Sequence, residues 1–135
     1  MAIKQLSVFV ENKKGSLVNV CKAFSNAGID MRATSIADTQ DFGILRVIVD
    51  DVDRALEIMH EKECIATVTE VVGVVIPHVP GGLSLILDIL NRADINIEYL
   101  YAFVGSSGKD AKVVLRVEDN EAAEKVLSES GITIL

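Results

Sequence analysis

Long apolar runs and an excess of positive charge are both missing from this 135-residue sequence. Its most apolar stretches, 71–79 and 83–90, are far shorter than the ~20 residues that a membrane-spanning helix needs. With 20 acidic and 13 basic residues, the net charge of -7 has the wrong sign for a protein that neutralises phosphates. We therefore expect neither a membrane segment nor nucleic-acid binding.

Signals for export, disulfides and metal sites are also missing. The N-terminus lacks the charged region and the unbroken apolar stretch of a secretion signal, which predicts a cytoplasmic protein. Cys21 and Cys64 stand far apart without a CxxC, so neither a disulfide framework nor a zinc knuckle is expected. Together with the two histidines they lack metal-ligand spacing, and we predict no metal and no cofactor.

Catalytic motifs are absent as well. A nucleophile needs a base beside it, and the two histidines, His60 and His78, lie outside any recognisable catalytic motif. The sequence contains no GxGxxG, no Walker loop and no HExxH. We therefore predict no catalytic residues and no enzymatic activity.

What the sequence does contain is a repeat of itself. A shift of 66 residues carries apolar positions of the first half onto apolar positions of the second, namely Leu6, Val8 and Val10 onto Val72, Val74 and Ile76. The same shift carries Gly15 onto Gly81, and beyond the middle hairpin a shift of 68 carries Ala55 onto Ala123. Such register-for-register similarity indicates two copies of one structural unit.

Each copy has the periodicity of a strand, a helix, two strands, a helix and a strand. In the first copy, strands are expected at 3–10, 29–37, 43–49 and 65–72, with a helix capped by Ser16 and another capped by Asp50 or Asp51. In the second, strands are expected at 73–79, 95–104, 111–117 and the C-terminus, and helices at 82–93 and 120–130. Hairpin turns fall at 38–41 and 105–108, and Gly28 and Gly131 each end a helix.

One stripe of each first helix should face the core. The inward positions are expected to be Leu17, Val20, Cys21, Phe24 and Ala27 in the first copy, and Leu83, Ile86, Leu87 and Leu90 in the second. The opposite face of the first sheet also carries apolar residues, Phe9, Ile44 and Ile48. A homodimer would cover that face, and we expect one.

The order of elements predicts an α+β, ferredoxin-like fold, in which a four-stranded antiparallel sheet has both helices on one face. We assign the first βαββαβ unit to residues 1–72 and the second to residues 73–135. No linker rich in Pro, Ser or charge separates them, and the sequence around Gly73 is almost continuous strand.

The turn between the first strand and the first helix of each copy is the most informative segment. It spans residues 12–17 (NKKGSL) in one copy and 78–83 (HVPGGL) in the other. A glycine there lets the backbone approach a ligand closely, and the helix start presents unpaired N–H groups to a carboxylate. Alternatively, Gly15 and Gly81 merely supply a backbone conformation that other residues resist. Finding the turn twice favours binding.

With these turns, the sequence resembles the ACT domain family, small ferredoxin-like modules that bind amino acids and regulate metabolic enzymes. The family's turn is commonly Asp or Asn, any residue, Pro, Gly, any residue, Leu. Lys14 stands at the Pro position of the first copy, and His78 at the acid or amide position of the second. A segment similar to the family's Gly-Ile-Asn-Ile recurs at 28–31 and 94–97. The resemblance covers nearly the whole chain, as two copies.

The resemblance implies that the two units pair side by side into one eight-stranded sheet, with helices on one face and a free amino acid bound at the seam. The ligand-binding residues would be Asn12, Gly15, Ser16 and Leu17 with Asn96 and Ile97 in one site, and His78, Pro80, Gly81, Gly82 and Leu83 with Asp30 and Met31 in the other. Turn N–H groups would receive the carboxylate, and Asn96 or Asp30 the ammonium. Local capping is the alternative role of Asn96 and Asp30.

The second site is expected to bind more tightly. Pro80 fixes the backbone before Gly81, Gly82 leaves room for close approach, and Asp30 supplies a full negative charge where the other site has an amide.

We thus predict a non-catalytic regulatory protein that binds an amino acid and acts on a partner such as a metabolic enzyme. Two alternatives remain: an interaction or assembly module without ligand, and a small enzyme on the same fold, since a fold does not fix a function.

Overall fold

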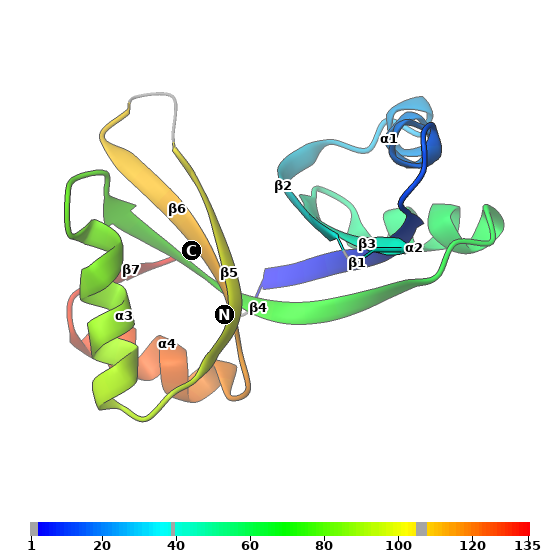
Figure 1. The fold of residues 1–135 in the computed structure, drawn as a ribbon. Coiled ribbons are helices and arrows are strands. Elements are labelled where there is room, and N and C mark those ends of the chain that lie inside the picture. The colour runs from blue at the N-terminus through cyan, green and yellow to red at the C-terminus, as the bar shows by residue number, and fades with distance from the viewer. Residues whose placement is uncertain (1–2, 39, 105–107) are drawn as a thin grey trace. The chain divides into compact units, whose positions relative to one another are not determined.

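The computed structural model describes residues 3–38, 40–104 and 108–135 (Figure 1). Along the chain the elements are β1 (Ile3–Glu11), α1 (Ser16–Asn26), β2 (Met31–Asp38), β3 (Phe42–Val49), α2 (Val52–Glu61), β4 (Ala66–Pro77), α3 (Gly82–Arg92), β5 (Ile97–Val104), β6 (Asp110–Val117), α4 (Asn120–Glu129) and β7 (Thr133–Ile134). This is an α+β chain that repeats one βαββαβ order, and the ferredoxin-like fold predicted from periodicity is confirmed. The predicted turns at 38–41 and 105–108 include positions 39 and 105–107, which lie outside the described residues.

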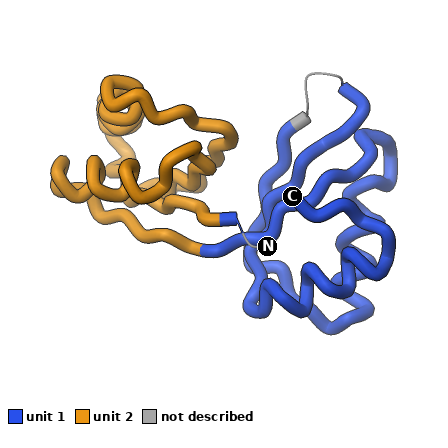
Figure 2. Tube along the Cα trace, turned by 180° about the vertical axis from the view of Figure 1, so that it is seen from behind, with its two compact units in different colours: residues 1–3, 70–135 blue, residues 4–69 orange. Residues whose placement is uncertain are grey.

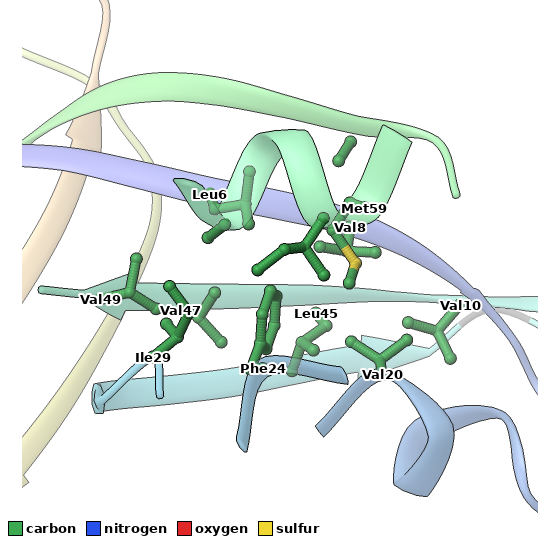
Figure 3. Close-up of a cluster of buried hydrophobic side chains, with 13 residues drawn as sticks. Leu6, Val8, Val10, Val20, Phe24, Ile29, Leu45, Val47, Val49 and Met59 are labelled. Atoms are coloured by element: carbon green, nitrogen blue, oxygen red, sulfur yellow. The ribbon is translucent and has the colours of Figure 1, made fainter. Parts of the chain in front are cut away.

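The N-terminal unit comprises residues 4–69, drawn in orange in Figure 2. Its strands lie in the order β2-β3-β1-β4, and β3 pairs antiparallel with both β1 and β2, with Leu6 opposite Val47. Helices α1 and α2 pack on each other. Figure 3 shows the core that the helices and sheet enclose, with Phe24 of α1 among side chains of the strands.

The C-terminal unit comprises residues 70–135 together with Ile3. Its strands follow the equivalent order β7-β4-β6-β5, with β6 antiparallel to both β4 and β5. Helices α3 and α4 pack together, and Ile86 and Leu90 of α3 are fully buried against the strands. A second apolar core therefore forms in this unit, separate from the first.

One strand, β4, serves both units. Just before β4 begins, the carbonyl of Ile65 accepts a hydrogen bond of 2.9 Å from the N–H of Phe9 in β1. Further along, residues 72–77 pair with β6, and Val74 and Val75 pair with β7. The described residues therefore contain seven strands where eight were expected, because one unbroken strand closes the first βαββαβ unit and opens the second.

Helices α2 and α4 begin at carboxylate caps. The Asp51 side chain accepts a hydrogen bond of 3.1 Å from the N–H of Arg54, and Asp119 makes the same bond with Ala122. Of the two predicted caps for α2, Asp51 is therefore the one used. At the other end of α1 and α4, Gly28 and Gly131 have positive φ angles of 72° and 83°, as expected for glycines that stop a helix.

Helices α1 and α3 begin differently from the prediction. The residue before each is a glycine in the left-handed conformation, Gly15 (φ 93°) and Gly81 (φ 87°), and neither helix has a side-chain cap. The prediction that Ser16 caps α1 is wrong, because Ser16 is already its first helical residue. Gly15 takes the cap position since a left-handed turn is needed there, and glycine adopts it without steric cost.

The expected inward stripes are confirmed at Val20, Phe24, Ile86 and Leu90. Cys21 and Leu87 were expected to face the core as well, but they are only half-buried and lie outside the two core clusters, where Ala23 and Ile89 pack instead. Leu17 and Leu83 are 39% and 38% exposed, and Ala27 is exposed as well. Both leucines belong to the first turn of their helix, next to the strand ends, where the sheet gives less cover. No helix within the described ranges is long and apolar enough to cross a membrane.

Removing the α2 cap should destabilise the protein. We expect Asp51→Ala to lower the free energy of unfolding by about 1 kcal/mol, because the N–H of Arg54 loses its acceptor. Asp51→Asn is the matched control, since an amide oxygen caps nearly as well. Urea denaturation measures both variants, and equal losses in the two would show that the capping bond is not the source of the stability.

Candidate functional site

The two predicted turns have the same conformation in their separate units. In the first, the N–H of Ser16 donates to the carbonyl of Lys13 (3.3 Å), and the N–H of Asn19 donates to Gly15 (3.1 Å). In the second, the N–H of Gly82 donates to the carbonyl of Val79 (3.0 Å), and Leu85 bonds to Gly81 (3.1 Å) in the same way. The repeat seen in the sequence therefore extends to individual hydrogen bonds.

Each turn is also anchored to the neighbouring hairpin of its own unit. The N–H of Asn12 donates to the carbonyl of Asp41 at 3.0 Å, and the N–H of His78 donates to that of Lys109 at 2.8 Å. Both acceptors lie just before the strand that pairs with the strand preceding the turn. The turns are thus held at fixed positions at the ends of the sheets, and little conformational entropy remains for a ligand to remove.

The start of each helix offers free backbone donors. The N–H groups of Leu17 and Val18 find no acceptor within the described ranges, and neither do those of Leu83 and Ser84. These groups lie at the positive end of the helix dipole. A side chain added at Gly15 or Gly81 would have no described atom within 4 Å, so the space above each glycine is open. Such a turn has the features needed to receive a carboxylate.

The second glycine of the second turn has another role. Gly82 is buried, and a Cβ atom there would clash with the carbonyl oxygen of Pro77. The room predicted for a ligand at Gly82 is therefore filled by backbone, and this glycine lets α3 pack closely on the end of β4. Gly81, which is exposed, is the residue that leaves open space.

Charge surrounds the first turn and is sparse around the second. The ammonium of Lys13 lies 2.8 Å from the carboxylate of Glu11, and this hydrogen-bonded pairing raises the pKa of Lys13. Lys14 is exposed, as are Pro80 and His78 of the second turn. The two turns share a backbone, but they present different side chains to an approaching molecule.

The predicted ammonium partners lie at strand starts. Asp30 and Asn96 are exposed, and no backbone N–H among the described residues donates to either side chain, which argues against local capping. The carboxylate of Asp30 lies 3.8 Å from the Nε of Arg32, and the carboxylate of Asp50 accepts a hydrogen bond of 3.0 Å from the N–H of Asp30. Met31 and Ile97, which follow them, are half-buried.

Each unit is described by itself, so the pairing of one unit's turn with the other unit's strand stays a prediction. Asn12, Gly15, Ser16 and Leu17 form one continuous turn in the same unit as Asp30 and Met31. His78, Pro80, Gly81, Gly82 and Leu83 form the other, in the unit of Asn96 and Ile97.

Sequence reasoning missed two cavities. In the C-terminal unit a hollow of about 200 Å³ lies beside the second turn, lined by His78, Val79 and Leu83 and by apolar residues of β5 and β6 such as Phe103 and Ala111. In the N-terminal unit a cavity of about 450 Å³ lies behind the first turn, between α1 and the residues that follow α2. Periodicity places apolar residues on a face, but it does not measure the volume that they fill.

No group of three or more His, Cys, Asp and Glu side chains within the described ranges is placed to hold a metal ion. His78 belongs to the second turn, and His60 is exposed in the last turn of α2.

Comparison with known proteins agrees with the fold. The family model of the ACT domain pair matches residues 1–134. Protein BT0572 from Bacteroides thetaiotaomicron, known from its crystal structure, is 38% identical and superposes with a TM-score of 0.94 over 100% of this chain and 92% of its own. No curated protein matches the sequence.

More distant structures share the fold. The regulatory subunit of aspartate kinase from Thermus thermophilus is 18% identical, with a TM-score of 0.69 over 94% of this chain and 91% of that subunit. The aspartate kinase of Clostridium acetobutylicum is 15% identical, with a TM-score of 0.57; the match covers 95% of this chain and 33% of that enzyme.

Adding a methyl group at Gly82 tests its packing role. We expect Gly82→Ala to lower the free energy of unfolding by about 1–3 kcal/mol, because the Cβ would overlap the Pro77 carbonyl and push α3 off the strand end. Ser16→Ala, at the equivalent position of the first turn, should change stability far less. A chemical denaturation curve for each variant decides the matter, and a neutral Gly82→Ala would contradict the close packing.

Proposed function

Since this chain belongs to the ACT domain family, as a tandem pair of ACT domains, we propose that it is a regulatory protein that binds a free amino acid at its glycine turns. The observation that carries the proposal is the pair of open, anchored turns, each with two N–H groups at a helix start that find no acceptor among the described residues. These groups suit the α-carboxylate, which every free amino acid has. No catalytic step is needed for such a role.

The ammonium of the ligand requires an acceptor of opposite polarity. Asp30 and Asn96 are exposed, make no capping bond among the described residues, and carry oxygen atoms suited to an ammonium. We propose that Asp30 completes the site of the second turn, and Asn96 that of the first. Arg32, which lies 3.8 Å from the Asp30 carboxylate, would then compete with the ligand for it.

The second turn is the stronger candidate of the two. Pro80 restricts the backbone before the open Gly81, and the adjoining apolar hollow of about 200 Å³ offers space for a ligand side chain. The walls of that hollow are mainly Ile76, Leu83, Phe103 and Val113. An amino acid with a small apolar side chain fits these walls better than a charged one, since a charge would lose its water there.

A metabolic enzyme is the class of partner that we propose for regulation. Solved structures with this fold include the regulatory subunit of an aspartate kinase, an enzyme that acts on an amino acid. A ligand that binds one conformation of the pair more tightly than another would shift their populations, and a partner would sense the shift.

An assembly role without ligand is the competing function, favoured by the apolar residues on the outer face of the N-terminal sheet. Phe9 is 47% exposed there, and Ile44 and Ile48 are half-buried. Ligand binding and assembly are compatible, and both are tested below.

Binding of an amino acid should stabilise the protein without consuming the ligand. At about 100 times its dissociation constant, the right amino acid is expected to add roughly 2.7 kcal/mol, which raises the melting temperature by several degrees. A thermal-shift screen of the common amino acids measures this. If none shifts the melt and calorimetry detects no heat, the assembly role without ligand replaces this proposal.

Charge removal at Asp30 tests the ranking of the two sites. We expect Asp30→Asn to weaken affinity by about 1.5–3 kcal/mol, because a charge-assisted hydrogen bond to the ammonium becomes a neutral one. Asn96→Ala, the matched change for the other turn, should affect the tighter site little. Calorimetric titration of folded variants gives both affinities, and the reverse pattern would show that the first turn holds the tighter site.

A homodimer should form through the apolar outer face of the N-terminal sheet. Sedimentation at micromolar concentration is expected to show about twice the 14.6 kDa mass of the chain. Phe9→Lys would place a charge on that face and should shift the protein towards the monomer. A monomer for the parent protein would overturn this proposal and leave ligand binding untouched.

A further inference from the structure

The N-terminal unit contains a cavity that adjoins the first turn at Lys13 and Ser16 and extends away from it. Its volume is about 450 Å³, and it lies between α1, the end of β1 and residues 62–65. Of the predicted ligand residues only Ser16 lines it, while Asn12, Gly15 and Leu17 do not. The volume falls in the range of about 300–1,000 Å³ that small-molecule sites occupy.

The internal repeat accounts for part of this space, on the side of the core. Four residues that line the cavity have a larger residue at the equivalent position of the C-terminal unit, where isoleucine occupies all four: Val10, Val20, Ala23 and Cys64 correspond to Ile76, Ile86, Ile89 and Ile132. The equivalences are secured by matching hydrogen bonds, since Cys64 N–H donates to Met59 just as Ile132 N–H donates to Leu127.

The four isoleucines belong to the C-terminal core or pack against it. In the N-terminal unit, each replacement withdraws at least one carbon from the same region. Figure 3 shows Val10 and Val20 beside each other within the core cluster. The cavity is open to solvent, and its walls include the exposed Phe42 and Ile65, so a ligand that covers its apolar surface would bury area that the protein alone leaves in water.

The walls determine the kind of molecule that fits. Val20, Ala23 and Met59 give the cavity apolar and polarisable walls on the core side, which suit a flat apolar group. Three polar side chains at its edge are unused: Ser16 and Asn19 make no side-chain hydrogen bond, and the ammonium of Lys62 has no ion-pair partner among the described residues. Lys13, the other cation at the cavity, is already paired with Glu11.

Glu63, next to Lys62, also lines the cavity. Its backbone is left-handed, with φ 58°, as are Gly28, Asp94 and Gly131 at the corresponding positions after the other helices, so this conformation belongs to the end of α2. The edge of the cavity presents a cation and an anion from neighbouring residues.

We propose that this cavity is a separate ligand site, for a small molecule with an aromatic group and a carboxylate. The aromatic group enters beside Ala23, Met59 and Cys64 on the core side of the cavity, and the carboxylate meets Lys62, with Ser16 and Asn19 as further donors. An amino-free aromatic acid and an aromatic amino acid share this chemistry. The amino acid would in addition place its ammonium on Glu63.

Methionine methyl groups report binding at this cavity directly. The chain has three methionines, of which Met59 lines the cavity and Met31 belongs to the proposed turn sites. With methyl-labelled methionine, titration with 3-phenylpropionate should shift the NMR signal of Met59 saturably and leave Met31 unchanged. Phenethylamine, which lacks the carboxylate, should not shift Met59.

L-phenylalanine distinguishes the two sources of the ligand. If it binds at Met59 more tightly than 3-phenylpropionate, Glu63 engages the ammonium and an amino acid is the ligand. Weaker binding identifies the amino-free acid. If neither carboxylate moves Met59, the cavity site is refuted, whereas a shift at Met31 alone would support the turn sites and contradict this one.

A larger side chain that fills the cavity supplies the second test. The equivalent position of the C-terminal unit supplies its control. Ala23→Ile introduces the isoleucine found at the equivalent position of the other unit, and it should weaken binding of 3-phenylpropionate at least about tenfold without lowering the melting temperature. Ile89→Ala, the reverse change in the C-terminal unit, should lower the melting temperature but leave binding unchanged.

Lys62→Gln tests the site without changing the core, because Lys62 is exposed. It therefore excludes the possibility that Ala23→Ile weakens binding only by repacking the core. It should weaken the carboxylate ligand severalfold. Parent-like binding by both Ala23→Ile and Lys62→Gln would overturn the proposal.

Discussion

The hydrogen bonding of strand β4 is the constraint on which both units depend. A strand can pair along two edges, and β4 uses different parts of its length for different partners: its N-terminal end adjoins β1, and residues 72–77 pair with β6. A break within it would remove the last strand of one sheet and the first strand of the next. The shared strand explains why no linker separates the repeats. Gly73 lies in the middle of this strand because a Cβ atom there would clash with Ile3 and crowd Leu135, which pack there.

Two copies of one unit in one chain allow each to serve as a reference for the other. Where they agree, the feature belongs to the fold. Shared features are the left-handed glycine before α1 and α3 and the aspartate cap of α2 and α4. The hydrogen bond from Asn19 N–H to the Gly15 carbonyl is shared as well, since Leu85 makes the same bond to Gly81. Where they differ, the feature belongs to one unit alone. Ser16 and Gly82 differ in this way, because only Gly82 lets the helix approach the strand end so closely. The different helix starts give the two turns different surroundings.

Most of the fold could be predicted from the sequence, because apolar spacing distinguishes strands from helices and the repeat tests each assignment twice. The order of elements, the glycine stops and the aspartate cap of α2 all follow from local chemistry. The predicted cap of α1 was wrong. Serine caps many helices, and the residue types around this turn do not show that Gly15 takes the cap position in a left-handed conformation. The continuity of strand sequence through Gly73 was predicted, but it was divided into two strands, at 65–72 and 73–79, since an apolar run does not show that one strand serves both units.

The sequence predicted which turns and residue types form the candidate site. It did not predict how much space a ligand has there, because that depends on packing. Sequence spacing placed Gly81 and Gly82 together, but packing separates their roles, since one faces open space and the other faces a carbonyl. The cavity of the N-terminal unit escaped notice because valine, alanine and cysteine satisfy the same apolar pattern as isoleucine. A comparison of side-chain volumes between the repeats, rather than of polarity, would have revealed it in the sequence.

Because each unit is small, ligand binding at the turns or in the cavity should have a large effect on its stability. Each unit is about half of 135 residues, and a domain that small buries only about 60% of the surface of its unfolded chain, so its core has little reserve. The N-terminal core has smaller side chains around the cavity, whereas the C-terminal core has isoleucines at the equivalent positions. A ligand that fills the cavity restores the missing contacts, and by linkage it stabilises the N-terminal unit most. Because β4 supplies a strand to both units, a ligand that stabilises the N-terminal unit also stabilises the strand that the C-terminal unit requires.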